Sequence, residues 1–205
     1  MGKKSRSKKL AAANPTQPSA RRPDTRWRVW GAGALAILAL GWGGWSWWQG
    51  QQVANQFPAL VAAGQAGLSR VETPRDEGRG HVGPGQTVPY ETDPPNSGPH
   101  WTTWVNPGIY TTAPRNEQLV HSLEHGHIVI YYDQPGEEAM RTLRAWVDRY
   151  QGQWDGVLAV RREGLGQRLI LTAWNKILRL DRFDPAVAAA FVDKYRGRGP
   201  ENPVR

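Results

Sequence analysis

The sequence contains no cysteine. This absence excludes disulfide bonds, thiolate metal ligands, iron–sulfur clusters and the redox chemistry of Cys-x-x-Cys pairs. Methionine is scarce, with only Met1 and Met140, so a thioether-rich copper(I) site is not expected. The sequence also lacks a P-loop, a Gly-x-Gly-x-x-Gly loop and a Gly-x-Ser-x-Gly elbow, which leaves nucleotide chemistry without support.

The positive charge of the chain is confined to its first residues. Lys and Arg total 26 against 18 Asp and Glu, a net charge of +8. Residues 1–28 contain nine of the basic residues and one of the acidic ones, so the rest of the chain has 17 of each. Because phosphate binding depends on surplus Lys and Arg, we do not expect the chain to bind nucleic acid.

An apolar stretch without an ionisable side chain runs from residue 29 to residue 48. A helix of this length would span ~30 Å, the thickness of a bilayer's hydrocarbon core. Tryptophan, which favours the headgroup region, lies at both ends: Trp27 and Trp30, then Trp42, Trp45, Trp47 and Trp48. We therefore expect one transmembrane helix. A cleaved signal peptide is the alternative, but its apolar region is usually shorter and no Ala-x-Ala site follows promptly.

The basic N-terminus sets the expected orientation, because cytoplasmic flanks of membrane helices are rich in Lys and Arg. Residues 1–28 would form a disordered cytoplasmic tail and residues 29–48 the transmembrane helix. Residues 49–69 would be a juxtamembrane spacer, and residues 70–205 an extracytoplasmic domain. The expected localisation is the cell membrane, as a single-pass protein whose one predicted partner is the bilayer.

Most regular structure is expected beyond residue 114. Residues 70–114 hold eight prolines and many glycines, and long segments of this kind often position functional groups. The expected helices are 116–124, one that follows Asp133-Gln134-Pro135 and one that starts at Pro185 after the N-cap Asp184; the expected strands are 127–132, 157–161, 168–174 and 177–180. The predicted fold class is α+β: a transmembrane helix, then one compact domain with a mixed sheet, helices packed on it and a long Pro/Gly-rich N-terminal segment.

All five histidines lie between residues 81 and 127: His81, His100, His121, His125 and His127. Without cysteine, this clustering indicates imidazole as the working group. His121 and His125 are four residues apart, so on a helix both rings face the same side. With Glu124 they form His-x-x-Glu-His, the inverted zinc-peptidase signature. That enzyme needs a long helix through the motif, whereas Gly126 and a predicted strand follow at once, so we do not expect a peptidase.

Two other features are expected to complete a site. His125 and His127 are two residues apart, a spacing that puts both rings on one face of an extended strand. Pro94-Pro95-Asn96-Ser97-Gly98-Pro99-His100 is stiffened by three prolines and predicts a rigid arm that holds Ser97 and His100. Three or four histidines around one point are a common neutral ligand set for Zn²⁺ or Cu²⁺.

These residues carry a resemblance to a known family. The motifs Ser97-Gly98-Pro99-His100 and His121-x-Leu123-Glu124-His125-Gly126, together with Tyr90, Tyr110 and Trp174, resemble the bacterial family known as domain of unknown function 3105. The resemblance covers about residues 80–200. It implies a basic N-terminus, one membrane helix and then this domain, and it implies no activity.

Three functions follow as hypotheses. The first is a Zn²⁺- or Cu²⁺-binding module for metal storage, sensing or delivery; its ligands would be His100, His121 and His125, with His127 or His81 as the fourth and with Glu117, Glu124, Ser97 and Tyr90 around them. The second is a metal-dependent envelope hydrolase, with an open coordination position for water and Glu124 as the candidate catalytic residue. The third is a non-catalytic interaction domain whose histidine cluster is structural.

Overall fold

The computed structural model describes residues 41, 43–45, 48, 51–52 and 55–205. The predicted basic tail, residues 1–28, and most of the predicted transmembrane helix, residues 29–48, lie outside the described residues. Within the described part of the chain, no helix is both long enough and apolar enough to cross a membrane. Residues Gly44–Arg205 form one compact unit, and the fold below is that of its described residues.

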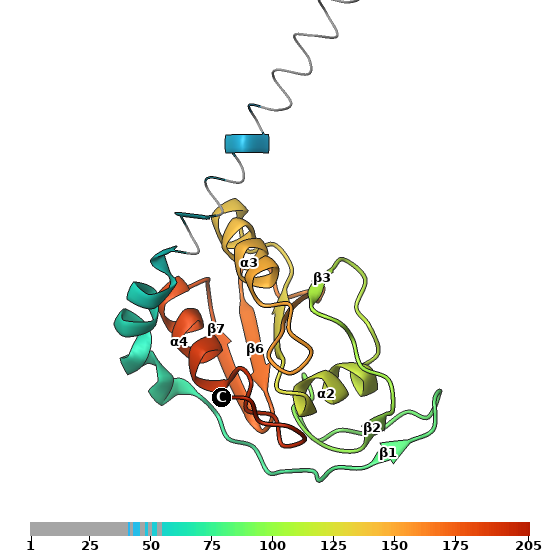
Figure 1. The fold of residues 1–205 in the computed structure, drawn as a ribbon. Helices are drawn as coiled ribbons and strands as arrows, with labels where there is room; N and C mark the ends of the chain where they lie inside the picture. Colours follow the sequence, from blue (N-terminus) through green and yellow to red (C-terminus); the bar gives the residue numbers. More distant parts are fainter. Residues whose placement is uncertain (1–40, 42, 46–47, 49–50, 53–54) are drawn as a thin grey trace, which may run out of the picture. The chain divides into compact units, whose positions relative to one another are not determined.

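A five-stranded mixed sheet forms the centre of this unit (Figure 1). Its strands, in spatial order, are β3 (Gly108–Tyr110), β5 (Val157–Arg161), β4 (Ile128–Tyr132), β6 (Leu169–Ala173) and β7 (Lys176–Leu180). Strands β3 and β4 run parallel to β5, whereas β6 is antiparallel to both β4 and β7. The predicted α+β class with a mixed sheet is confirmed.

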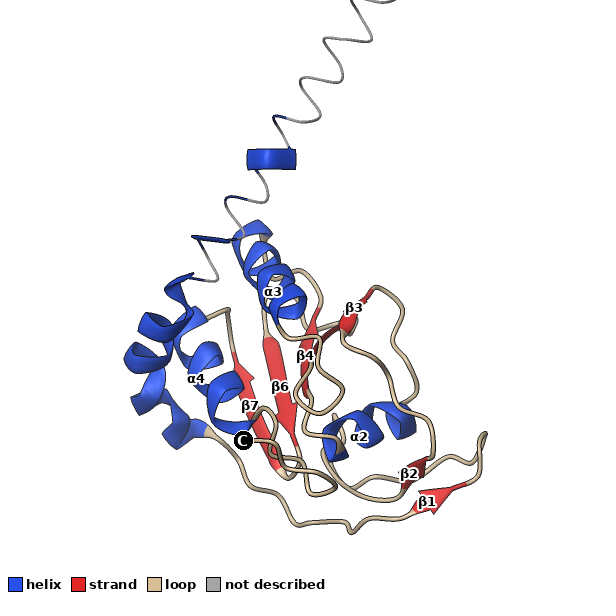
Figure 2. Cartoon of the chain, viewed as in Figure 1, coloured by secondary structure: helices blue, strands red, loops and turns tan. Residues whose placement is uncertain are grey.

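Three α-helices accompany the sheet in the part that the structure describes beyond residue 70. They are α2 (Asn116–Glu124), α3 (Glu137–Arg149) and α4 (Pro185–Tyr195). The Asp184 carboxylate accepts hydrogen bonds from the amides of Ala186 and Val187 at 3.1 Å, so it caps α4 as the sequence predicts. Helix α3 packs against β5 and β3, and α4 packs against β6, whereas α2 lies beside β2 and β4 (Figure 2).

The two faces of the sheet bury separate apolar clusters. In β4, Ile128 and Ile130 belong to the cluster that includes Trp146 of α3 and residues of α4. Val129 and Tyr131 belong to the second cluster, which includes Leu119 and Leu123 of α2. Because successive side chains of a strand point to opposite faces, the continuous apolar run of β4 serves both clusters. The sheet thereby fixes α2, whose C-terminal end carries the histidine motif.

Residues before position 70 contribute to the same core. Residues 55–64 are helical, and a 3₁₀ helix, η1 (Gln65–Arg70), follows them. The Phe57 ring is 4% exposed and packs edge-on against Trp146 and Tyr150, with ring centroids 5.6 Å apart in both pairs. A Cβ at Gly64 would lie 1.9 Å from the Ala186 carbonyl oxygen, so glycine permits the close approach to α4. The segment expected to be a spacer is thus packed from Phe57 onward.

Candidate metal centre

A short parallel ribbon brings the first two histidines together. It consists of β1 (His81–Val82) and β2 (His100–Trp101), with His81 and His100 in register. The amides of Gly98 and His100 donate to the carbonyls of Gly78 and Gly80 at 3.0 and 2.9 Å. Residues in register on neighbouring strands point to the same face, and the two imidazole centroids lie 5.1 Å apart.

The proline-rich arm before β2 is held by specific contacts. The Tyr90 hydroxyl donates to the Pro99 carbonyl at 2.7 Å, and the Ser97 hydroxyl accepts from the Glu77 amide at 3.1 Å. Gly98 has φ +113°, and a Cβ there would lie 3.1 Å from the Tyr90 ring. Tyr90 and Ser97 therefore position the arm, and the His100 side chain is fully buried at its end.

The end of α2 supplies two more ligand atoms. The His121 ring lies 4.8 Å from that of His100 and 5.2 Å from that of His81, measured between centroids. Glu124 is the last residue of α2, and its Oε2 lies 3.0 Å from His100 Nε2. One ligand atom from each of His81, His100, His121 and Glu124 lies within 4.8 Å of the other three. We call these four residues the inner group.

Backbone carbonyls fix which nitrogen each buried ring presents. His100 Nδ1 lies 2.9 Å from the Gly98 carbonyl oxygen, and His121 Nδ1 lies 2.7 Å from that of Trp101. A carbonyl oxygen only accepts, so Nδ1 carries the proton in both rings and Nε2 keeps its lone pair in the neutral form. His100 Nε2 is buried without a hydrogen-bond partner among the described residues. Metal-binding histidines are typically oriented in this way.

Burial keeps His121 neutral. Burial, as the largest cause, and the neighbouring His100 and His125 rings together lower the pKa of His121 to about 4. The imidazole is therefore uncharged near pH 7, with Nε2 available as a ligand. Burial also lowers the pKa of His125. Neutral rings suit a cation site, because metal ions bind only the deprotonated nitrogen.

His125 belongs to a second group of ligand atoms. Its Nε2 lies 3.0 Å from Glu201 Oε2, which is also 3.9 Å from His121 Nε2. The ligand atoms of these three residues lie within 4.8 Å of one another. Trp104 and Trp154 contact the His125 ring at centroid distances of 4.6 and 4.3 Å. We call His121, His125 and Glu201 the outer group.

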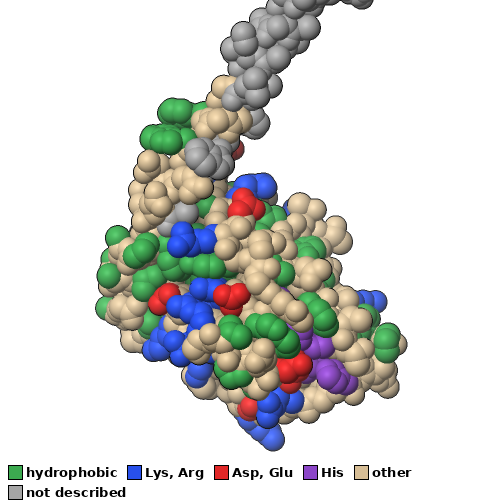
Figure 3. All heavy atoms as spheres, in the orientation of Figure 1, with side chains coloured by type: hydrophobic (Ala, Val, Ile, Leu, Met, Phe, Trp, Pro, Cys, Tyr) green, Lys and Arg blue, Asp and Glu red, His purple; other side chains and the backbone are tan. Residues whose placement is uncertain are grey.

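The C-terminal segment brings Glu201 to this point by a close backbone contact. The Gly197 amide donates to the Gly126 carbonyl at 2.8 Å, and the Glu201 amide donates to the Glu124 carbonyl at 3.3 Å. A Cβ on Gly199 would lie 2.1 Å from the Glu124 carbonyl oxygen, so the approach requires glycine there. Figure 3 shows histidine side chains gathered at the surface beside acidic ones.

Comparison with known proteins places the sequence in a family. The model of the family described as protein of unknown function (DUF3105) matches residues 81–205, which is more than half of the chain and includes all five histidines. The chain belongs to this family. No curated protein and no solved structure matches the chain.

The structure of the DUF3105 domain separates the predicted metal ligands into residues of the inner group, residues of the outer group and one residue that belongs to neither. It brings His81, His100 and His121 together, and it places Glu124 among the ligand atoms, where the sequence had suggested a supporting role or a catalytic one. His125 lies in the outer group. His127 is in neither group of the described residues: its Nε2 donates to the Gln153 carbonyl at 2.7 Å, and its centroid is 6.0 Å from that of His125.

Two acidic residues complete the comparison with the sequence-based hypothesis. Glu117 accepts a hydrogen bond from the Val88 amide at 3.1 Å and so supports the irregular segment before the arm. Glu201 was missed by sequence reasoning. It lies 74 residues beyond His127, the last histidine of the sequence, and no motif marks it. Only the fold of the C-terminal segment brings it to His125.

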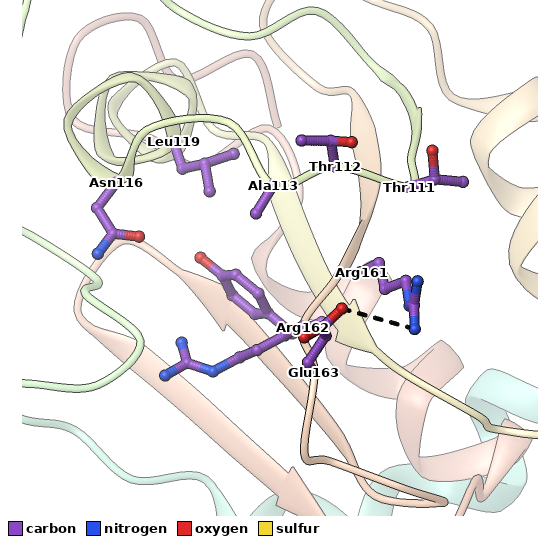
Figure 4. Close-up of a pocket in the computed structure, with 9 residues that line it drawn as sticks. Thr111, Thr112, Ala113, Asn116, Leu119, Arg161, Arg162 and Glu163 are labelled. Carbon is purple, nitrogen blue, oxygen red and sulfur yellow. Dashed lines mark ion pairs between the residues drawn. The ribbon is translucent and has the colours of Figure 1, made fainter.

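A hollow at the other end of α2 is a second feature of the DUF3105 domain (Figure 4). Asn116 and Leu119 of α2 line it, together with Arg161 and Arg162 at the end of β5. Both guanidinium groups already have carboxylate partners: Arg161 pairs with Asp133 and Glu163, and Arg162 pairs with Asp93. The arginines are therefore neutralised locally, and the hollow has no unpaired guanidinium to attract an anion.

Proposed function

We propose that this DUF3105 protein binds one transition-metal ion, Zn²⁺ or Cu²⁺, through the inner group. The ligands are Nε2 of His100, Nε2 of His121, a ring nitrogen of His81 and the carboxylate of Glu124. One observation carries the proposal: two buried imidazoles, each oriented by an Nδ1–H bond to a backbone carbonyl, have ligand atoms within 4.8 Å of those of a carboxylate and a third imidazole.

The donor set suits such an ion. Zn²⁺ takes four ligands, commonly imidazole nitrogens and a carboxylate oxygen, at about 2 Å from the metal. Cu²⁺ also accepts imidazole and carboxylate, whereas copper(I) favours the sulfur ligands that this chain lacks. The contact between His100 Nε2 and Glu124 Oε2 supports the same conclusion. Two acceptor atoms 3.0 Å apart in a buried site need a proton or a cation between them.

The proposal extends to where the ion is handled. The basic N-terminus and the apolar residues 29–48 support a single-pass anchor with the DUF3105 domain on the extracytoplasmic side. An anchored domain with one such site suits metal storage, sensing or delivery in the cell envelope.

The geometry favours binding over the hydrolase alternative. In the His-x-x-Glu-His signature the glutamate acts as general base, and a base must be free to take a proton from water. Glu124 instead lies 3.0 Å from His100 Nε2, among the ligand atoms. A structural histidine cluster is the remaining alternative, and it predicts that no metal is bound.

Elemental analysis of the full chain tests the proposal. The protein is purified in detergent through a histidine-free tag and incubated with Zn²⁺ or Cu²⁺. We expect about one equivalent of metal, and we expect His100→Asn and His121→Asn to weaken binding at least tenfold. His127→Asn is the matched control and retains the metal, because His127 lies outside both groups of the described residues. Less than about 0.1 equivalent in the parent chain would refute the proposal.

A further inference from the structure

The outer group shares one residue, His121, with the inner group. An ion held by the inner group and an ion held by the outer group would therefore compete for the same imidazole. The number of lone pairs on that ring decides whether both ions can be bound together.

His121 offers one nitrogen to a metal. Its Nδ1 donates to the Trp101 carbonyl at 2.7 Å, so Nε2 is the one lone pair left on the neutral ring. A single lone pair binds a single ion. The inner and outer positions are therefore mutually exclusive for any ion that uses His121, and the protein holds one ion in either of two adjacent positions.

The two positions differ in ligand number. The inner group has four ligands, of which His81 is exposed and the other three are buried. The outer group has three, of which Glu201 is exposed and the other two are buried. An ion that moves inward exchanges a position with one buried ligand besides His121 for a position with two, and it gains a ligand, so the inner position is the more stable one.

We propose that His125 and Glu201 form a transfer position through which the ion enters and leaves the inner group. The ion first binds His125 Nε2 and the Glu201 carboxylate, and it moves inward as His121 Nε2 joins His100, His81 and Glu124 around it. No bond is made or broken other than those to the metal, and the ion keeps its charge. This inference rests on the proposed function.

The contacts of the outer group suit this role. Trp104 and Trp154 pack against the His125 ring and keep its Nε2 directed at Glu201. Glu201 lies in the C-terminal segment, which is attached to the motif through the Gly197–Gly126 and Glu201–Glu124 hydrogen bonds. Its carboxylate is thus fixed at the surface, 3.9 Å from the nitrogen that the two positions share.

Kinetics of Zn²⁺ transfer test the inference in the full chain. Zn²⁺ is supplied from a fluorescent chelator and later withdrawn by a stronger one, and both rates are measured by stopped flow. We expect Glu201→Gln to slow loading and release together by about tenfold, because a transfer position lowers the barrier in both directions. Glu124→Gln removes a ligand of the inner position and should accelerate release. Glu163→Gln, an exposed carboxylate near Arg161, is the matched control.

Four results would overturn the inference. Unchanged loading and release rates in Glu201→Gln would remove the transfer role while the proposed function stands. Faster release in Glu201→Gln would make Glu201 a ligand of the resident ion. Two equivalents of Zn²⁺ in the parent chain would make the groups independent sites. A parent chain that binds no metal would refute the proposed function and this inference with it.

Discussion

The orientation of each imidazole ring distinguishes the histidines proposed as metal ligands from the histidine that is not. His100 and His121 use Nδ1 for backbone carbonyls and direct Nε2 towards the neighbouring ligand atoms. His127 does the opposite: its Nε2 donates to Gln153, and its Nδ1 is buried without a hydrogen-bond partner in the described part of the chain. The role of each chemically identical side chain therefore depends on which of its two ring nitrogens meets a backbone carbonyl.

His127 should make the metal-free protein less stable in acid. Burial lowers the pKa of His127 to about 4, below its usual value of 6.5. The unfolded chain therefore binds more protons between these values, and stability is lost as the pH falls from about 6.5 towards 4. We expect the free energy of unfolding, measured with urea, to be lower at pH 5 than at pH 7.5. His127→Asn should reduce that difference, and an unchanged difference would contradict this assignment.

The corner between α2 and β4 depends on one glycine. Helix α2 ends at Glu124 and β4 begins at Ile128, so the chain must turn within three residues. Gly126 has φ +90°, and a Cβ there would lie 2.8 Å from both the Gly199 amide nitrogen and the Trp154 carbonyl oxygen. The turn and the docking of the C-terminal segment thus require glycine at the same position.

Gly126→Ala should disturb both stability and metal binding. Gly164 is a matched control, because its φ is +85° but nothing lies within 4 Å of its added Cβ. We expect Gly164→Ala to cost about 1 kcal/mol of unfolding free energy from backbone strain alone. Gly126→Ala adds two backbone clashes and should cost at least ~2 kcal/mol more.

Metal affinity provides the second measurement for this pair. Gly126→Ala should weaken metal binding, because the clash displaces the corner that holds Glu124 and His125. Equal losses of stability in the two variants would show that the close backbone approach is unimportant.

The sequence predicted the α-helices and the strands of the main sheet better than the shortest strands. Helix α2 and strand β5 were predicted with their observed bounds, and apolar, β-branched runs such as that of β5 are typical of buried strands. Strands β1 and β2 have two residues each and carry no such pattern. Their pairing, which brings His81 to His100, depends on contacts between distant parts of the chain.

The order of the strands in the sheet also could not be predicted from local sequence patterns. Residues 157–161 and 169–173 follow one another in sequence, yet β4 lies between them in the sheet. Burial of β4 on both faces is consistent with this central position. The central place of β4 in turn fixes the start of the strand, and therefore the position of His125 and His127 directly before it.

The packed unit is larger than the predicted domain of residues 70–205. Phe57 is buried against Trp146 and Tyr150, and Gly64 and Gly67 contact α4. A chain cut at residue 70 would expose these surfaces. Experiments on the metal centre should therefore use the full chain.

The predicted anchor can be tested on the full chain in cells. We expect the protein to stay with the membrane fraction after washing at alkaline pH, because a 20-residue apolar helix holds far more tightly than surface charge. External protease should digest the DUF3105 domain and spare the basic tail, as the positive-inside rule requires. A Leu35→Arg, Leu38→Arg double variant is the control that should abolish anchoring. Release of the parent chain by the wash would contradict the prediction.

Local sequence was enough to establish composition, the neutral charge of the folded part, the main helices and strands, and the histidines as candidate ligands. These properties depend on residue type and on spacing along short segments. The identity of the inner group depended on the three-dimensional fold, because His81, His100 and Glu124 meet through strand pairing and helix packing. Glu201 joins His125 for the same reason: glycine contacts fold the C-terminal segment onto the corner, and no local pattern encodes that contact.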